Sequence, residues 1–132
     1  MASVPPQELE FELSHYGQLK YLKDYFNKVS ERENRMKTIL KTRRLNLSNN
    51  FARAMPHLLS MKILFPNLTE LNLAENNLRT IEANDLVKCL PKLEILNISK
   101  NRLSDFEEIH ALDKLAKLRS LDIRDNPSLS LS

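Results

Sequence analysis

The stretch LTELNLAENNL, residues 68–78, recurs as LEILNISKNRL at residues 93–103. Each copy has an aliphatic residue at its first, fourth, sixth and eleventh positions and an Asn at its ninth. Two further segments share the core of this pattern, TRRLNLSNN ending at Asn50 and LRSLDIRDN ending at Asn126. When the four segments are aligned on the Asn, they follow one another at intervals of 26, 25 and 25 residues. Such nearly constant spacing indicates a solenoid of stacked repeats.

Each copy contains a short segment in which aliphatic and polar residues alternate. The aliphatic pairs are Leu45 and Leu47, Leu71 and Leu73, Leu96 and Ile98, and Leu121 and Ile123. Alternation with a period of two residues predicts a short strand with one buried face. One such strand cannot bury its apolar face alone, so we expect the four strands to stack in parallel around a shared core.

The Asn that ends each copy is expected to have a structural role. The chain must turn sharply after each strand, and such a turn leaves backbone amides and carbonyls that point inward and need partners. An Asn side chain supplies both a donor and an acceptor. We therefore predict a buried ladder formed by Asn50, Asn76, Asn101 and Asn126.

The segments between the strands carry the other half of the repeat. Residues 85–93, DLVKCLPKL, and residues 107–118, EEIHALDKLAKL, have aliphatic residues at helical spacing. Both are predicted to be helices on the convex side of the solenoid. Pro66 and Pro91 come just before a predicted strand, where a helix should end.

Together these features resemble the leucine-rich repeat, whose consensus is LxxLxLxxNxL with a period of 20–29 residues. The resemblance covers residues 42–132 and implies an α/β fold: a leucine-rich repeat solenoid of about four repeats, with parallel strands on the concave face and helices on the convex face. Residues 1–41 do not fit the repeat, but their apolar residues have helical spacing at 19–29 and again at 36–40. Because solenoid ends expose core, we predict that residues 1–41 form an N-terminal helical cap; a partner-binding helix is the alternative.

No motif in the sequence predicts catalysis. The three His residues are scattered and lack metal-ligand spacing with Cys89, and one Gly in the chain leaves no phosphate-cradling loop. Glu107 and Glu108 are expected in the first turn of a helix rather than as an acid–base pair. We predict that the protein is not an enzyme and uses no cofactor, metal or small-molecule substrate. The single Cys, the absence of a signal-peptide pattern and the absence of a transmembrane stretch predict an intracellular protein, nuclear or cytoplasmic.

Function is then expected on a surface, and the first hypothesis is a protein-interaction module. Repeats of this length with LNLxxN strands resemble the short intracellular class of the phosphatase-regulatory and acidic nuclear phosphoprotein families. That resemblance implies a rigid curved sheet that binds a partner protein through outward-facing strand residues. The predicted partner-binding residues are Arg44, Asn46, Glu70, Asn72, Ile95, Asn97, Asp122 and Arg124. Ile95 is a predicted contact anchor, and the simpler interpretation of the polar column is solvation, with side-chain amides bonding along the stack.

The second hypothesis is RNA binding. The net charge is only +3, but no acidic residue occurs between Glu33 and Glu70. A helical cap, about four repeats and the segments FPNLTELNLAENNL and LPKLEILNISKNRLSDFEEIHAL are similar to the leucine-rich domain of the nuclear RNA export factor family. That resemblance implies a contribution to RNA binding and mRNA transport through basic residues. The candidates are Arg35, Lys37, Lys41, Arg43, Arg44 and Arg53. Ordinary solvated charge is the alternative.

Overall fold

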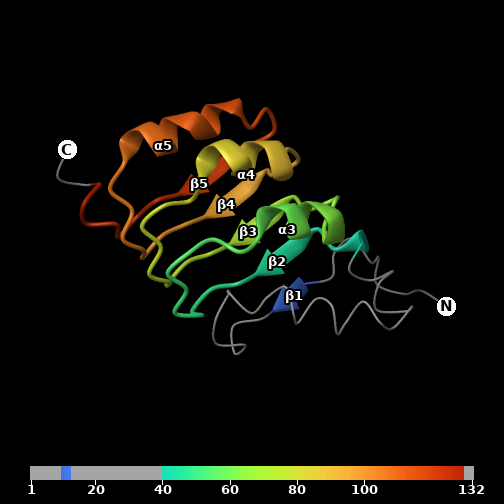
Figure 1. Cartoon of the computed structure of the whole chain (residues 1–132), viewed down its shortest axis with the longest axis horizontal. Coiled ribbons are helices and arrows are strands. Elements are labelled where there is room, and N and C mark those ends of the chain that lie inside the picture. The colour runs from blue at the N-terminus through green and yellow to red at the C-terminus, as the bar shows by residue number, and fades with distance from the viewer. Residues whose placement is uncertain (1–9, 13–39, 130–132) are drawn as a thin grey trace.

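The computed structural model describes residues 10–12 and 40–129 (Figure 1). Strands and helices alternate along the described chain, as expected for an α/β repeat fold. The elements are β1 (Glu10–Glu12), β2 (Arg44–Asn46), α3 (Leu58–Leu64), β3 (Glu70–Asn72), α4 (Ala83–Cys89), β4 (Ile95–Asn97), α5 (Phe106–Ala111), the 3-10 helix η3 (Leu112–Lys114) and β5 (Ser120–Asp122).

The strands form one parallel sheet in the order β1-β2-β3-β4-β5. Figure 1 shows α3, α4 and α5 stacked side by side on one side of this sheet, and consecutive helices are in contact. The register places equivalent residues of consecutive repeats opposite one another. One row is Arg44, Glu70, Ile95 and Ser120, the next is Leu45, Leu71, Leu96 and Leu121, and the third is Asn46, Asn72, Asn97 and Asp122.

The core lies between the sheet and the helices. The central Leu of β2, β3 and β4 is at most 1% exposed, and helix residues such as Met61 and Leu86 pack against the same layer. In the last repeat, Leu121 and Ile123 are only half-buried. A terminal repeat has a described neighbour on one side only, so its strand gains less burial than the strands inside the stack.

The two predicted convex helices are present as α4 and as α5 with η3, and both α3 and α4 end just before Pro66 and Pro91. Helix α3 was not predicted. Its buried residues Leu58, Met61 and Leu64 have helical spacing, but the exposed Leu59 and Ile63 lie between them. Five apolar residues in a seven-residue helix hide the amphipathic pattern that sequence analysis relies on.

The helices of the predicted cap, residues 1–41, lie almost entirely outside the described residues, so that cap stays a prediction. The described parts of this region are residues 40–41, which are helical, and β1, which pairs with β2 and extends the repeat sheet by one strand. This strand was not predicted, because the segment EFE offers one apolar residue and no repeat motif.

The predicted Asn ladder is confirmed. The Oδ1 atom of Asn76 accepts hydrogen bonds from the backbone amides of Asn50 and Ala52 at 2.9 and 3.0 Å. Its Nδ2 atom donates to the carbonyls of Leu47 and Leu73 at 3.2 and 2.9 Å. The side chain therefore joins the turn of its own repeat to the backbone of the repeat before it.

Asn101 and Asn126 make the equivalent bonds in the next two repeats. Their Oδ1 atoms accept from the amides of Leu78 and Leu103 at 3.0 and 3.1 Å. All four ladder residues are buried, with at most 6% of their surface exposed. The residue before each ladder Asn has a positive φ of 56–59°, and it is Asn49, Glu75, Lys100 or Asp125. None of these residues is Gly, so the left-handed conformation costs of order 1 kcal/mol at each turn. The hydrogen bonds of the buried ladder offset this cost.

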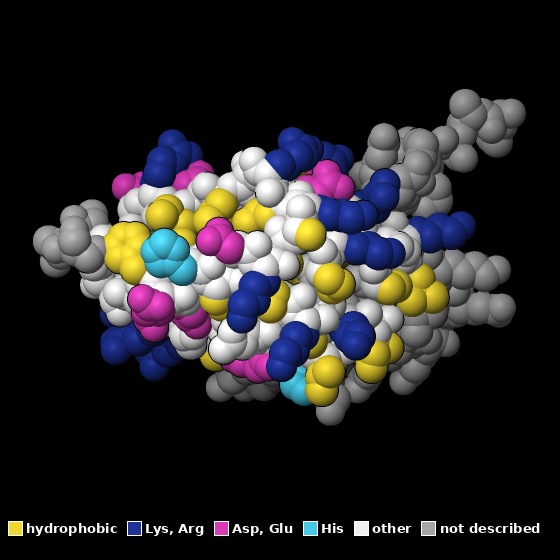
Figure 2. Space-filling model, turned by 90° about the horizontal axis from the view of Figure 1, so that it is seen from above, with side chains coloured by type: hydrophobic (Ala, Val, Ile, Leu, Met, Phe, Trp, Pro, Cys, Tyr) yellow, Lys and Arg dark blue, Asp and Glu magenta, His cyan; other side chains and the backbone are white. Residues whose placement is uncertain are grey.

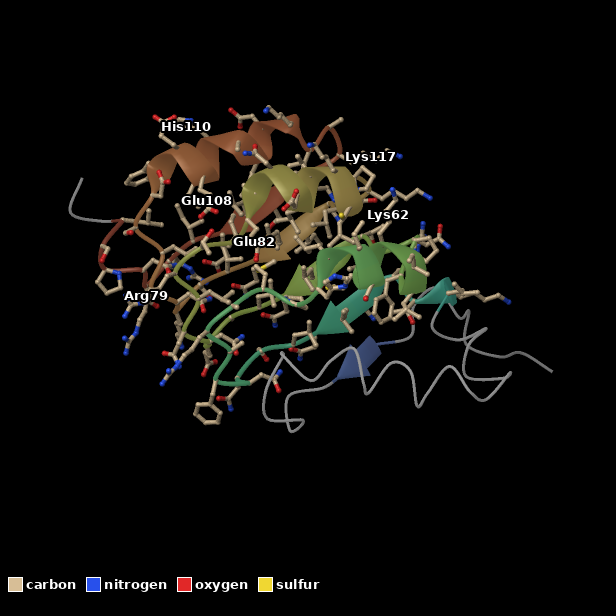
Figure 3. All side chains as sticks on the ribbon, viewed as in Figure 1. Lys62, Arg79, Glu82, Glu108, His110 and Lys117 are labelled. Atoms are coloured by element: carbon tan, nitrogen blue, oxygen red, sulfur yellow. The ribbon has the colours of Figure 1, made fainter. Side chains whose placement is uncertain are left out.

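A second tie between repeats begins in the first turn of α5, where Glu107 and Glu108 lie as expected. The carboxylate of Glu108 accepts hydrogen bonds from the hydroxyl of Thr80 and, at 3.2 Å, from the amide of Ile81. Figure 3 shows Glu108 directed toward the segment that precedes α4, where Glu82 lies. The backbone amide of Glu82 in turn donates to the Thr80 hydroxyl at 3.0 Å. Glu108 thus has a structural role beyond its position in a first turn.

Substituting Asn76→Ala should lower the free energy of unfolding by about 1–3 kcal/mol, because buried amides and carbonyls of two repeats lose their partner. Chemical denaturation followed by circular dichroism measures this change. Asn77→Ala is the matched control: Asn77 is half-buried, and its side chain forms no hydrogen bond with any described residue. Equal stability of the two variants would contradict the structural role assigned to the ladder.

Candidate protein-binding surface

The sheet face opposite the helices, here called the concave face, presents a polar column of Asn46, Asn72, Asn97 and Asp122. In every strand the Oδ1 atom accepts a hydrogen bond from the backbone amide two residues later, at 2.9, 2.9, 3.0 and 3.1 Å along the column. This local bond is the Asx-turn arrangement that Asn and Asp favour where a strand ends. It fixes the orientation of all four side chains.

The expectation that side-chain amides bond along the stack is wrong for Asn72 and Asn97. Their Oδ1 atoms bond within their own strand ends, to Ala74 and Ser99. Their Nδ2 groups make no hydrogen bond with any residue that the structure describes, and both side chains are half-buried. The local bond forms in place of a cross-strand bond because each Oδ1 atom lies close to the backbone amide two residues later in the chain. Asn72 and Asn97 therefore present oriented N–H donors that have no acceptor among the described residues.

Asp122 and Arg124 form an ion pair at the end of the column. Arg124 Nη2 lies 2.7 Å from Asp122 Oδ2, and Arg124 Nε donates to Oδ1 at 3.0 Å. These side-chain hydrogen bonds, with the one from the Arg124 backbone amide, lower the pKa of the Asp122 carboxyl below its ordinary value. The same side-chain bonds raise the pKa of the Arg124 guanidinium. These two predicted partner-binding residues thus bind each other.

Ile95 lies in a shallow groove of about 400 Å³ at the start of the strands. Three residues of the predicted partner-binding set, Arg44, Glu70 and Ile95, line this groove together. The other lining residues are Arg43, Thr69, Glu94 and Arg119. Arg119 Nε lies 3.3 Å from Glu94 Oε1. Because its walls carry both signs of charge, we call this depression the mixed-charge groove. Ile95 is half-buried and is the one aliphatic side chain in this lining.

The nucleic-acid candidates that the structure describes do not gather at one site. Arg35 and Lys37 lie outside the described residues. Arg43 and Arg44 share the mixed-charge groove, whereas Arg53 follows the strand and its ladder Asn and lines a different depression. Lys41 is exposed and lines neither of these depressions. The basic residues of the acid-free interval are thus separated in the structure, with Arg43 and Arg44 at the start of β2 and Arg53 in the loop that follows it.

The depression that Arg53 lines also has a volume of about 400 Å³, and its other lining residues are Asn77, Arg79 and Arg102. Arg79 and Arg102 were missed by sequence analysis because acidic residues follow each of them closely in the chain. Aligning the loops that follow each ladder Asn would have revealed part of the pattern. Arg53 and Arg79 both stand three residues after their ladder Asn.

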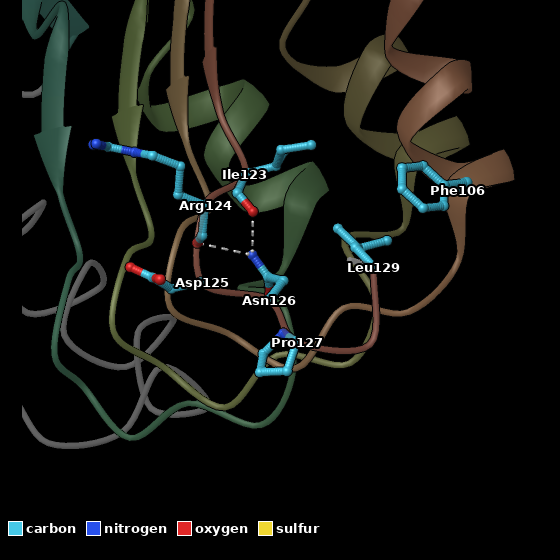
Figure 4. Close-up of a pocket in the computed structure, with 7 residues that line it drawn as sticks. All are labelled: Phe106, Ile123, Arg124, Asp125, Asn126, Pro127 and Leu129. Atoms are coloured by element: carbon cyan, nitrogen blue, oxygen red, sulfur yellow. Dashed lines mark hydrogen bonds between the residues drawn. The ribbon is translucent and has the colours of Figure 1, made fainter. Parts of the chain in front are cut away.

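A third depression, of about 460 Å³, lies beside the last described repeat (Figure 4). Phe106, Ile123, Pro127 and Leu129 supply its apolar lining. Its amide group belongs to the ladder: Asn126 Nδ2 donates to the carbonyls of Ile123 and Arg124 at 3.0 and 3.4 Å, the bonds dashed in Figure 4. We assign no ligand to this depression.

The helical side of the solenoid differs from the concave face. Figure 2 shows Lys and Arg side chains spread over this side, with Asp, Glu and hydrophobic side chains between them. Among the described residues, no group of three His, Cys, Asp or Glu side chains is placed to hold a metal ion. No described helix has the length and apolar composition needed to cross a membrane.

Comparison with known proteins identifies the repeats. Residues 66–127 match the protein family described as leucine rich repeat. This match, together with the parallel sheet and the alternating helices, supports leucine-rich repeats in residues 66–127. Leucine-rich repeats generally mediate protein–protein interactions and are typically non-enzymatic. No curated protein matches the chain. Nothing in these comparisons supports the similarity to nuclear RNA export factors.

Substituting Arg124→Ala should raise the pKa of Asp122 toward its ordinary value of 3.8, because the hydrogen bonds from the Arg124 side chain are removed. A pH titration of the Asp122 carboxyl carbon by NMR measures this change. Since the folded pKa is the lowered one, the pair stabilises the fold above the ordinary carboxyl pKa, and that contribution is lost as the pH falls through the folded pKa.

Arg119→Ala is the control for this titration, because it removes an exposed Arg that pairs with Glu94 instead. It should leave the pKa of Asp122 unchanged. An Asp122 pKa that does not respond to Arg124→Ala would mean that the ion pair does not form in solution.

Proposed function

We propose that the concave face binds a segment of a partner protein. The observation that carries this proposal is the pair of Nδ2 groups on Asn72 and Asn97, which are held in a fixed direction and have no acceptor among the described residues. A polypeptide segment lying along the column would offer backbone carbonyl or carboxylate oxygens to these donors.

The mixed-charge groove supplies the apolar contact. Ile95 stands between Glu70 and Ser120 in its row, at the start of its strand. An aliphatic or aromatic side chain of the partner would cover Ile95. Contacts between the partner and the charged residues around Ile95 would then exclude water from this apolar contact. An apolar centre with a polar rim is the usual anatomy of a protein–protein interface.

Rigidity supports the same function. The column side chains are fixed by their Asx-turn bonds, and the strands beneath them are held by the buried ladder. A surface that is ordered before binding loses little conformational entropy when the partner arrives. The groove is a poorer fit to RNA, because Glu70 and Glu94 stand among its arginines and would repel a phosphate backbone.

Random peptides displayed on phage and selected on the whole chain provide a partner of the proposed chemistry. Fluorescence polarisation then compares the affinity of one selected peptide for each variant. Ile95→Asp should weaken binding about tenfold or more, because a central contact residue contributes more than about 1 kcal/mol. Ile63→Asp makes the same change on α3, where Ile63 is 69% exposed on the opposite side, and should leave the affinity within about twofold.

Asn97→Asp tests the donors alone. The new carboxylate keeps the oxygen that accepts from Ser99 and replaces the N–H donor by an acceptor, as Asp122 already does in the next strand. It should weaken peptide binding, whereas Asn84→Asp on α4 should not. Peptides whose affinity falls with the α3 or α4 variants, and not with the concave-face variants, would refute the proposed surface.

A further inference from the structure

The depression lined by Arg53, Asn77, Arg79 and Arg102 lies beyond the concave face, on the loops that follow the ladder. Its three arginines are exposed, and none forms an ion pair or a side-chain hydrogen bond with another described residue. The lining includes no Asp or Glu. Figure 3 shows Arg79 extending outward from this edge of the molecule, away from the helices.

The repeat explains why these four side chains converge. Asn77 and Arg102 are the first residues after their ladder Asn, and Arg53 and Arg79 are the third. The intervening residues Ala52 and Leu78 are buried, so the residues on either side of them face outward. Neighbouring repeats stack at about the spacing of sheet strands, roughly 4.8 Å, which brings equivalent loop residues within reach of one ligand.

The loops that carry these residues are fixed to one another. The amide of Asn77 donates to the carbonyl of Ala52 at 2.7 Å, and the amide of Arg102 donates to the carbonyl of Leu78 at 2.8 Å. The amides of Ala52 and Leu78 donate to the ladder residues Asn76 and Asn101. The backbone beneath the three arginines is therefore ordered in the absence of ligand.

From this geometry we infer that the arginine pocket, lined by Arg53, Asn77, Arg79 and Arg102, binds the phosphate group of a phosphorylated polypeptide. Each guanidinium presents a planar fork of donors that matches phosphate oxygens, and the Asn77 amide adds a further donor. Like charges around one depression repel one another, and a dianionic ligand removes that repulsion. This inference concerns a different surface from the concave face and does not rest on the proposed function.

Charge favours a phosphorylated side chain over a nucleic acid. A phosphate monoester on Ser or Thr concentrates a charge of about −1.5 to −2 on one group, which suits a single local cluster of three cations. A nucleic acid carries one charge per nucleotide and needs a track of cations along its backbone. Here the described arginines nearest the start of the strands share their groove with Glu70 and Glu94.

NMR titration of the arginine Nε–Hε signals of the whole chain tests the inference. The probes are a short blocked Gly-phosphoSer-Gly peptide, the same peptide without phosphate, and a short oligouridine, all at constant ionic strength. The phosphopeptide should shift the signals of Arg53, Arg79 and Arg102 saturably, and the unphosphorylated peptide should not. Arg79→Gln should weaken phosphopeptide binding about tenfold, because one charge-assisted contact is lost.

Lys117→Gln is the control variant. It removes the same charge from the far side of the molecule, as Figure 3 shows, and should leave the phosphopeptide affinity within about twofold. The inference is overturned if the three signals do not shift, if both peptides shift them equally, or if both variants weaken binding equally. Tighter binding of oligouridine through the same arginines would overturn the assignment to a polypeptide.

Discussion

The buried side chain of one Asn per repeat is the interaction on which the rest of the structure depends. It replaces the glycine that a sharp turn would otherwise need, because its bonds to the backbone of the turn hold the preceding residue, Asn49, Glu75, Lys100 or Asp125, in a left-handed conformation. Further bonds from Asn76, Asn101 and Asn126 join each of their repeats to the one before it. A chain with a single Gly can therefore make four tight turns in succession and keep its strands in register.

The Asn ladder positions both candidate surfaces, the concave face and the arginine pocket. On the strand side of each ladder Asn, the register aligns the polar column, and Asx-turn bonds leave the Nδ2 groups of Asn72 and Asn97 directed outward. On the loop side, the ladder fixes the buried residues Ala52 and Leu78, and the arginines beside them converge. Binding in either place would use a surface that is already ordered, which is the main advantage of a solenoid over a flexible chain.

The sequence was sufficient for the features that repeat and insufficient for those that depend on three-dimensional neighbours. Four asparagines at nearly constant spacing predicted the ladder and the parallel strands, and the rows of the sheet followed from them. Helix α3 was missed because Leu59 and Ile63 are exposed apolar residues that blur its pattern. The arginine pocket was missed because its residues come from three repeats. They are separated in the sequence and do not form a cluster of basic residues there. The acid-free interval does not correspond to one surface of the described residues, since Arg43 and Arg53 line different depressions.

Native-state hydrogen exchange of the amides of Ala52, Leu78 and Leu103 tests the role of the ladder most directly. These amides lie in loops, yet each donates to a buried ladder Oδ1 atom. If the ladder holds the repeats together, these amides exchange only by global unfolding, with the same free energy as the amides of the central strands. Exchange at the rate of exposed loop amides would contradict the account, because the turns would then open without disrupting the sheet.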